Sequence, residues 1–380
     1  MNTPISRIHK PDYTSWAEVD LGAIRHNFQQ LKKIAGKGIK ILSVVKADAY
    51  GHGMVPVARV LNQEKTDFFG VADTSEGITL RQNGIKKPIL IFENALPSYV
   101  PEIIRYNLTA TVCALSLAAA LNRLAKKAGK KVKVHIKIDT GMGRLGVWHQ
   151  DALEFVAAVN QLTNLTLEGI YTHFPVADTD RSFTLNQIKL FLGFVSQLKK
   201  CGVVVPFIHA ANSAGLIDYP TKGFNLVRPG LSLYGMYPHP RLKLKIKLKP
   251  ALSVKSRIMF IKKIRKGRSV SYGRTFISTA PMTIATIPVG YNDGYFRYLS
   301  NTSHVLVEGI SCPVVGRVTM DQLMVDVSKV KLVKEGMEVA LLGRQKNSAI
   351  SAEGLAEMAH TINYEISCSL GNRLPRVYKI

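Results

Sequence analysis

The sequence has few cysteines, no long hydrophobic run and no recognisable signal peptide. Its four cysteines lie far apart and form no C-x-x-C pair, which argues against a disulfide framework and against a thiolate zinc site. A membrane-spanning helix would need about 18 apolar residues in succession, and the chain has no such stretch. We therefore expect a cytoplasmic protein with reduced thiols and no membrane association.

Patterns of metal ligands are also missing, and acidic residues are scarce. None of the ten histidines falls in an H-E-x-x-H pattern and no carboxylates have the spacing of a calcium loop, so we expect no required metal. With 26 acidic against 51 basic side chains, the net charge is +25. Such a surface attracts phosphates and nucleic acids non-specifically, but charge alone does not identify a binding protein.

The most basic segment is RLKLKIKLKP, residues 241–250. Its lysines alternate with apolar residues at the period of a strand, so we expect them to share one face. No aromatic residue interrupts the segment to stack on bases. We interpret it as a solvated strand or domain connector and expect no specific nucleic-acid partner.

Apolar runs and helix-like segments alternate regularly through the first two thirds of the chain. Segments whose apolar positions recur at three and four residues separate the runs. Eight β-α repeats over roughly 200 residues predict an α/β fold with a (β/α)8 barrel of the TIM type, which we place at residues 15–240. The eight runs are ILSVV, FFGVA, PILIF, ATVCA, VKVHIKI, LEGIYTH, VPFIHA and NLVR.

The pattern changes after Tyr234 and Gly235. Short runs rich in Val, Ile and Thr, separated by turn residues, predict strands between about residues 250 and 345. One helix-like segment, SAEGLAEMAHTI, follows them. We therefore expect a β-rich C-terminal domain over residues 241–380, joined by the N-terminal segment 1–14.

Five unusual residues fall at the predicted C-terminal ends of the barrel strands, where barrels of this type carry function. They are Lys46, Arg144, His173, Ser213 and Arg228. A lysine there is either a salt-bridged structural residue or a partly desolvated amine able to form a Schiff base. Ser213 and the backbone amides of RPGL, residues 228–231, could hold a phosphate. A reactive lysine, a phosphate cradle and an arginine together suggest pyridoxal 5′-phosphate (PLP).

Eight motifs, in order along nearly the entire chain, closely resemble those of bacterial alanine racemase. The resemblance implies a PLP-binding barrel followed by a β-domain, and interconversion of L-alanine and D-alanine that supplies D-alanine for peptidoglycan. It also implies a homodimer in which both subunits build each active site. The motifs are SVVKADAYGHG, KIDTGMGRLG, HAANSAG, LVRPGLSLYG, SVSYG, PVGYNDGY, VGRVTMDQ and TINYE.

The resemblance assigns the two groups that racemisation needs on opposite faces of the substrate's Cα. Lys46 resembles the lysine that bonds PLP and acts as base toward the D-enantiomer. Tyr272, contributed by the other subunit, resembles the base toward the L-enantiomer. Because a free tyrosine has a pKa near 10, this role requires positive neighbours, and we expect His173 and Arg228 to supply them.

Further positions resemble the family's binding residues. Arg228 resembles the residue that faces the pyridine nitrogen, which would keep that nitrogen unprotonated and limit transamination. Arg144 and the backbone N–H of Met320 resemble the site for the substrate carboxylate. Lys137 matches a lysine that is carbamylated in many members and positions that arginine. The cofactor-holding set implied is Lys46, Tyr50, His173, Ser213, Arg228, Gly230, Leu231 and Tyr364.

Some residues keep a structural alternative. Tyr291 and Asp321 are expected to support the site, but Tyr291 and Tyr364 could instead be core or interface aromatics. Asp321 could be a solvated turn residue. His209, at the end of an apolar strand, is interpreted as a satisfied core histidine.

The chain also departs from the family's usual residues at Pro175-Val176, Asn292 and Thr319. None of these removes an expected catalytic group, but they leave side-chain selectivity open. A broader PLP-dependent racemase, acting on serine or basic amino acids, is therefore the alternative activity.

Rival classes of function are weaker. The loop GMGRLG matches the dinucleotide pattern G-x-G-x-x-G. An NAD site also needs an acidic residue at a set distance after the glycines, and Glu168 lies only loosely near that place. Arg144 inside the loop also argues against an NAD site. A non-catalytic PLP-binding protein would not need the second domain that carries Tyr272. A nucleic-acid-binding protein would bind DNA in a salt-sensitive way without Lys46.

Overall fold

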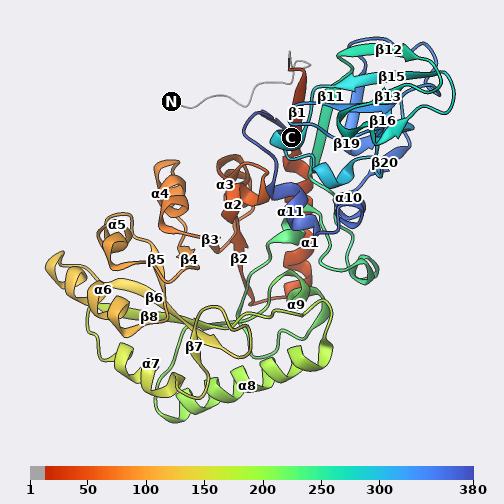
Figure 1. Cartoon of the computed structure of the whole chain (residues 1–380). Coiled ribbons are helices and arrows are strands. Elements are labelled where there is room, and N and C mark those ends of the chain that lie inside the picture. The colour runs from red at the N-terminus through yellow and green to blue at the C-terminus, as the bar shows by residue number, and fades with distance from the viewer. Residues whose placement is uncertain (1–12) are drawn as a thin grey trace. The chain divides into compact units, whose positions relative to one another are not determined.

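The computed structural model describes residues 13–380 and divides them into two compact units (Figure 1). The barrel unit contains residues 24–49 and 54–249, and the strand-rich unit contains residues 13–23, 50–53 and 250–380. The predicted joining of residues 1–14 to the C-terminal domain falls almost wholly outside the described residues. In the part of the chain that the structure describes, no helix is long and apolar enough to cross a membrane.

The barrel is a ring of parallel strands. Strand β10 pairs with β2, and the N–H groups of Asn225 and Arg228 donate to the carbonyls of Ile208 and Ala211, which brings the last strand against β9. Each of the eight predicted apolar runs contains one strand, so the predicted barrel is confirmed; the short strand β7, Val147–Trp148, pairs with β6 in addition. The sheet order is β10 (Leu226–Val227), β2 (Lys40–Val44), β3 (Phe68–Val71), β4 (Ile89–Ile91), β5 (Thr109–Val112), β6 (Val132–Asp139), β8 (Leu165–Tyr171) and β9 (Phe207–His209).

Helices connect the barrel strands, and their ends follow local capping rules. Helix α8 begins after Asp180, whose side chain accepts the Phe183 N–H, and it buries Phe191, Phe194 and Leu198. Buried apolar side chains at three- and four-residue spacing explain why these segments are helices. The helices are α1 (Leu21–Ala35), α2 (Lys46–Tyr50), α3 (Met54–Gln63), α4 (Thr74–Gln82), α5 (Val100–Arg105), α6 (Leu115–Lys127), α7 (Ala152–Asn160), α8 (Arg181–Lys200) and α9 (Ser213–Asp218).

The basic segment 241–250 is not a strand, so that alternative is wrong. It begins as a 3-10 helix, η3 (Pro240–Leu244), with Pro240 at its first position. Leu242 and Ile246 are both buried, which is helical rather than strand spacing. Arg241 and Lys245 both pair with the buried carboxylate of Asp218. The helical turn brings these two side chains to the same carboxylate.

The strand-rich unit contains three sheets, which confirms the predicted β-rich second domain. Strand β1 (Ser15–Asp20) pairs antiparallel with β11 (Leu252–Arg257) and parallel with β21 (Arg376–Lys379). This pairing explains why residues before the barrel belong to the strand-rich unit. The larger sheet continues through β19 (Glu338–Gln345), β16 (His304–Val307) and β17 (Ile310–Pro313), with β20 (Ser348–Ile350) on β19.

The strand-rich unit also contains a three-stranded and a two-stranded sheet. One has the order β12 (Phe260–Ile264), β15 (Met282–Ile287) and β18 (Leu323–Asp326), and the other pairs β13 (Ser269–Val270) with β14 (Phe276–Ile277). Val270, Ile284 and Val315 form a small core between them. Helices α10 (Ala352–Met358) and α11 (Asn363–Cys368) follow, where one helix was expected.

Candidate active site

Lys46 follows strand β2 and enters a turn with unusual backbone geometry. Ala47, Asp48 and Ala49 have φ angles of 53°, 49° and 55°, so these non-glycine residues lie in the left-handed region. Each residue held there costs about 1–2 kcal/mol. The Ala49 N–H closes the turn on the Val45 carbonyl at 2.9 Å. The surrounding fold, rather than local preference, therefore sets the direction in which Lys46 leaves the strand.

Glu76 anchors this turn and was not predicted from the sequence. Its Oε1 accepts the Ala47 N–H at 2.6 Å, and its Oε2 accepts the Ala72 N–H at 2.7 Å. In the sequence, Glu76 looks like an ordinary first-turn residue of helix α4. Its contact with the turn after Lys46 exists only once β2 and β3 are paired.

Arg228 follows strand β10 and is 3% exposed. Its Nη2 donates to the carbonyls of Thr172 and Ala210 at 2.8 and 2.9 Å and to His173 Nδ1 at 3.3 Å, and its Nη1 donates to His209 Nδ1 at 2.9 Å. Burial lowers the pKa of Arg228 to about 10, which leaves it protonated at neutral pH. Within residues 13–380, its Nε has no hydrogen-bond acceptor, so this N–H is available to a ligand.

The donors of Arg228 also determine where the protons lie in a pair of buried histidines. Because a guanidinium only donates, His209 Nδ1 must accept, and its Nε2 carries the proton donated to His135 Nδ1 at 2.8 Å. His135 Nε2 faces Glu168 Oε2 at 3.5 Å, and Lys133 binds the other oxygen of Glu168 at 2.6 Å. His209 is thus a satisfied core histidine that also orients Arg228. The sequence did not predict that His135 and Glu168 continue the series of polar contacts that starts at Arg228.

His173 is neutral, which corrects an expectation. Burial lowers its pKa well below the usual range, and the positive charges of Arg228, Lys137, Arg144 and Lys46 lower it further. The prediction that His173 would add positive charge beside a tyrosine is therefore wrong, and Arg228 is the positive member of that pair. Four cations near one neutral imidazole suit an anionic ligand.

The loop GMGRLG, residues 141–146, does not offer a dinucleotide site. Asp139 Oδ1 accepts the N–H groups of Gly141 and Met142, and its Oδ2 accepts that of Gly143, all at 2.8 Å. A carboxylate of the chain already occupies the amides that a pyrophosphate would need. Arg144 extends from this loop as an exposed side chain.

Lys137 is a buried lysine on strand β6, and it is 3% exposed. Burial lowers its pKa to about 8, and the positive charges of Arg144 and Arg228 contribute. A lysine in this state has a substantial neutral fraction near physiological pH, unlike a solvated lysine.

Ser213 brings together the loops after β9 and β10. Its Oγ accepts the N–H groups of Gly230 and Ser232 at 3.0 and 3.2 Å, and Leu231 lies between them at the start of η2 (Leu231–Tyr234). The hydroxyl proton of Ser213 is then directed to another acceptor. The Gly230 N–H, which was expected to hold a phosphate directly, donates to Ser213 in this structure.

The remaining predicted residues lie in the strand-rich unit. The rings of Tyr50 and Tyr364 are neighbours, with centroids 6.0 Å apart and planes inclined by 42°. Tyr272, Tyr291 and Met320 are exposed by 73%, 43% and 54%. A core position for Tyr291 is therefore wrong, and these three side chains are free to meet a ligand or a partner surface.

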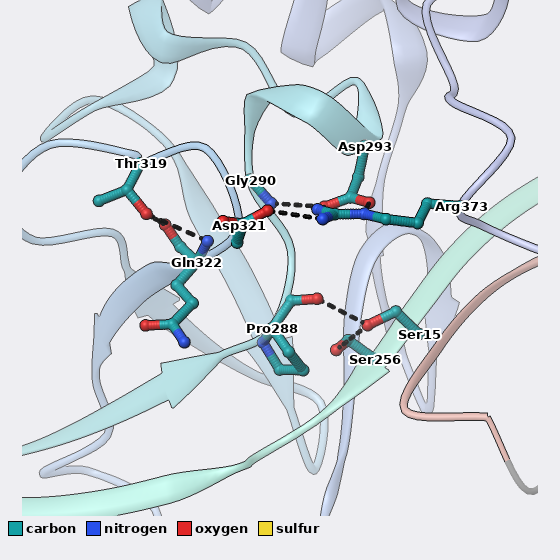
Figure 2. A network of polar contacts seen from close by, with 9 residues as sticks. All are labelled: Ser15, Ser256, Pro288, Gly290, Asp293, Thr319, Asp321, Gln322 and Arg373. Carbon is teal, nitrogen blue, oxygen red and sulfur yellow. Dashed lines mark hydrogen bonds and ion pairs between the residues drawn. The ribbon is translucent and has the colours of Figure 1, made fainter.

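Asp321 belongs to a charged network in the same unit (Figure 2). Arg373 Nη1 donates to Asp321 Oδ1 at 2.6 Å, and Arg373 Nε and Nη2 each donate to Asp293 at 2.8 Å. Asp321 is thus an exposed turn residue, with its side chain 56% exposed, that also forms an ion pair. Arg373 and Asp293 were not predicted, because nothing in the sequence relates residues 80 positions apart.

The barrel residues fit PLP. The Lys46 amine at the end of a strand suits the aldehyde of PLP. The Ser213 hydroxyl between two loops suits the phosphate, and the unused Arg228 Nε–H suits the pyridine nitrogen. The cationic surroundings of His173 suit the negative charge of the phosphate. Among the described residues, no group of His, Cys, Asp and Glu side chains could hold a metal ion.

Comparisons with known proteins find the same family in both parts of the chain. The family profile "Alanine racemase, N-terminal domain" matches residues 19–238, and "Alanine racemase, C-terminal domain" matches residues 251–378. The chain is 46% identical to the alanine racemase of Halothermothrix orenii over 374 residues, 98% of each chain.

Two solved structures show the same similarity in three dimensions. Alanine racemase from Bacillus anthracis with bound L-Ala-P has a TM-score of 0.91 at 36% identity, over 97% of this chain and 96% of that chain. Alanine racemase from Bartonella henselae with covalently bound pyridoxal phosphate has a TM-score of 0.86 at 28% identity, over 97% of this chain and 100% of that chain.

Proposed function

The chain belongs to the alanine racemase family, and from this membership we propose that Lys46 and Tyr272 exchange the α-proton of alanine from opposite faces. Members of this family are PLP-dependent isomerases that interconvert L-alanine and D-alanine, which supplies D-alanine for peptidoglycan. The observation that carries the residue assignment is the position of Lys46 at the end of β2, held by Glu76 beside a cluster of cations.

Lys46 holds the cofactor and moves a proton on one face. When bound, PLP withdraws electrons from Cα of the amino acid, so that its α-hydrogen can leave as a proton. The left-handed turn after Lys46 limits the directions open to its side chain, and Glu76 prevents that turn from relaxing. A fixed amine is what repeated proton transfer at a single carbon requires.

Arg228 controls the far end of the cofactor. Nη1 and Nη2 already bind groups of the chain, so the Nε–H would be the group of Arg228 available to the pyridine nitrogen, and it would act there only as a donor. Burial lowers the pKa of both His209 and His135, so this histidine pair adds no positive charge beside Arg228. This arrangement favours proton exchange at Cα over transamination.

Arg144 and the Met320 N–H are proposed to bind the substrate carboxylate. Among the described residues, none accepts a hydrogen bond from the Met320 N–H, which leaves that donor for a ligand. Ser213, Gly230, Leu231, Tyr50 and Tyr364 are proposed to surround the phosphate.

A homodimer in the cytoplasm is part of the same proposal. Tyr272, Tyr291 and Met320 are large side chains exposed on the strand-rich unit, where a partner surface can reach them. A second copy of the chain whose barrel site receives Tyr272 and Met320 would give these residues their function.

Lys137 is proposed to carry a carbamate that orients Arg144. Its neutral amine adds to CO₂ and releases one proton; with a pKa of about 8, about a tenth of the amines are neutral at pH 7. Since raising the pH through this pKa increases the neutral fraction, a carbon-13 carbamate signal in labelled bicarbonate is expected to grow from about pH 7 to about pH 9.

Lys133 provides the matched control, because it lies on the same strand with its side chain 51% exposed. Lys137→Met should remove the carbamate signal and Lys133→Met should keep it. A signal that persists in the Lys137 variant would reject this site.

The activity is tested by incubating L-alanine with the purified protein and PLP in D₂O, followed by chiral separation with mass detection. D-alanine with deuterium at Cα is expected, because the returning proton comes from solvent. Unchanged L-alanine from a folded, PLP-loaded protein would contradict alanine as the substrate. Parallel incubations with serine and lysine measure side-chain selectivity.

A further inference from the structure

The turn from Gly290 to Asp293 and the turn from Thr319 to Gln322 lie side by side in the strand-rich unit (Figure 2). Tyr291 belongs to the first turn and Met320 to the second. The Tyr291 N–H donates to the Thr319 carbonyl at 3.0 Å, and the Asn292 N–H donates to the Met320 carbonyl at 3.1 Å. At Gly290, an added Cβ would lie 2.3 Å from both carbonyl oxygens, so only glycine permits this approach. The position of Met320 therefore depends on the turn at residues 290–293.

Arg373 binds one carboxylate from each turn. Its Nε and Nη2 hold both oxygens of Asp293 at 2.8 Å, and its Nη1 holds Asp321 at 2.6 Å. The Asp293 side chain is 4% exposed and also accepts the Gly290 N–H at 2.9 Å. A buried carboxylate needs such partners, and a bidentate guanidinium restricts its orientation more than a point charge does.

The segment that presents Arg373 is itself fastened. The Gly371 N–H donates to the Asp293 carbonyl at 3.2 Å. Arg376 donates to the carbonyls of Leu370, Gly371 and Leu374 at 2.8, 2.7 and 2.8 Å. Arg373 thus extends from a closed turn, and its guanidinium has little freedom to follow the two loops if they move apart.

We propose that Arg373 is a positioning residue for the substrate carboxylate: by joining Asp293 to Asp321, it holds the Met320 N–H in the place where that carboxylate binds. The inference rests on the proposed function, because it assumes that Met320 binds the carboxylate. Arg373 touches neither substrate nor cofactor in this role. It acts through the two paired turns.

The test compares Arg373→Gln, Asp321→Asn and wild type as PLP-loaded enzymes. The probe is propionate, which has the carboxylate of alanine but no amine to react with the cofactor. Arg373→Gln should raise both the KM for alanine and the inhibition constant of propionate by about ten- to a hundred-fold, because loss of a hydrogen bond to a charged group weakens binding by about this factor. The visible absorbance of bound PLP should stay unchanged.

Asp321→Asn should raise both constants in the same direction, by about two- to five-fold, because an exposed ion pair contributes little. This variant decides the matter if Arg373→Gln does not fold. Lys346→Gln, which breaks the exposed Lys346–Glu308 pair of the same unit, is the control and should leave both constants unchanged.

Wild-type protein that fails to racemise alanine would reject the proposed function. If wild type racemises alanine but the propionate constant is unchanged in Arg373→Gln and Asp321→Asn, the positioning role is wrong. A fall in kcat with no change in either constant would also overturn it, because the effect would then not lie at the carboxylate. Partial recovery in Arg373→Lys, which keeps the charge but not the bidentate contact, would support it.

Discussion

Lys46→Ala is expected to lose the covalent attachment of PLP and at least about 10³-fold of the racemisation rate, because one side chain supplies both the bond and a proton-transfer group. The structure adds a reason why no other group substitutes for it. Glu76 and the Val45 carbonyl each bind an N–H group of the turn after β2, and this turn orients the side chain at position 46 and at no other lysine. Borohydride reduction followed by peptide mass spectrometry locates the attached PLP, and the chiral assay measures the rate.

Lys40 is the matched control for that experiment. It lies at the other end of β2, its side chain is 52% exposed, and it pairs with Asp67 at 2.9 Å. Lys40→Ala should keep both the PLP attachment and the activity. An undiminished lysine–PLP adduct in a folded Lys46→Ala protein would contradict the assignment.

Tyr272→Phe is expected to slow α-proton exchange from L-alanine by about 10²- to 10⁴-fold, the usual size of a lost acid–base group. Since Tyr272 is 73% exposed, removing one oxygen should not disturb folding or PLP binding. Tyr298→Phe is a suitable control because Tyr298 is 77% exposed in the same unit. Deuterium incorporation from D₂O, measured separately from each enantiomer, gives the result.

Mixing the two inactive variants tests whether two subunits build each site. A heterodimer of Lys46→Ala and Tyr272→Phe subunits would contain one site with both groups intact and one with neither. Random mixing should then restore about a quarter of wild-type activity, since half of the dimers carry one working site out of two. Heterodimers demonstrated by native mass spectrometry but without activity would show that the sites are not shared.

The barrel was predictable because its strands are buried on both faces. Such strands are short apolar runs, as in ILSVV for β2 and NLVR for β10, and their regular alternation with amphipathic helices leaves few other folds. The same logic failed at residues 241–250. There the alternation of Lys with Leu and Ile matches a strand, but the buried carboxylate of Asp218 binds Arg241 in the 3-10 helix and Lys245 directly after it.

The sequence by itself determined the order of the strands and the family motifs. It therefore determined which strand ends carry Lys46, Ser213 and Arg228, because the carboxyl ends of parallel strands meet at one end of a barrel. The position of each of these residues relative to its strand can be read from the neighbouring residues in the sequence. No contact with a distant part of the chain is needed to predict it.

Only the tertiary structure decided the state of these groups. Glu76, from the next β-α unit, binds the left-handed turn after Lys46, and His173 is neutral because burial and nearby cations oppose its proton. The joining of the Tyr291 and Met320 turns by Arg373 is likewise invisible in the sequence. Hydrogen bonds and charges act across space, so protonation and orientation depend on neighbours that the linear order of residues does not identify.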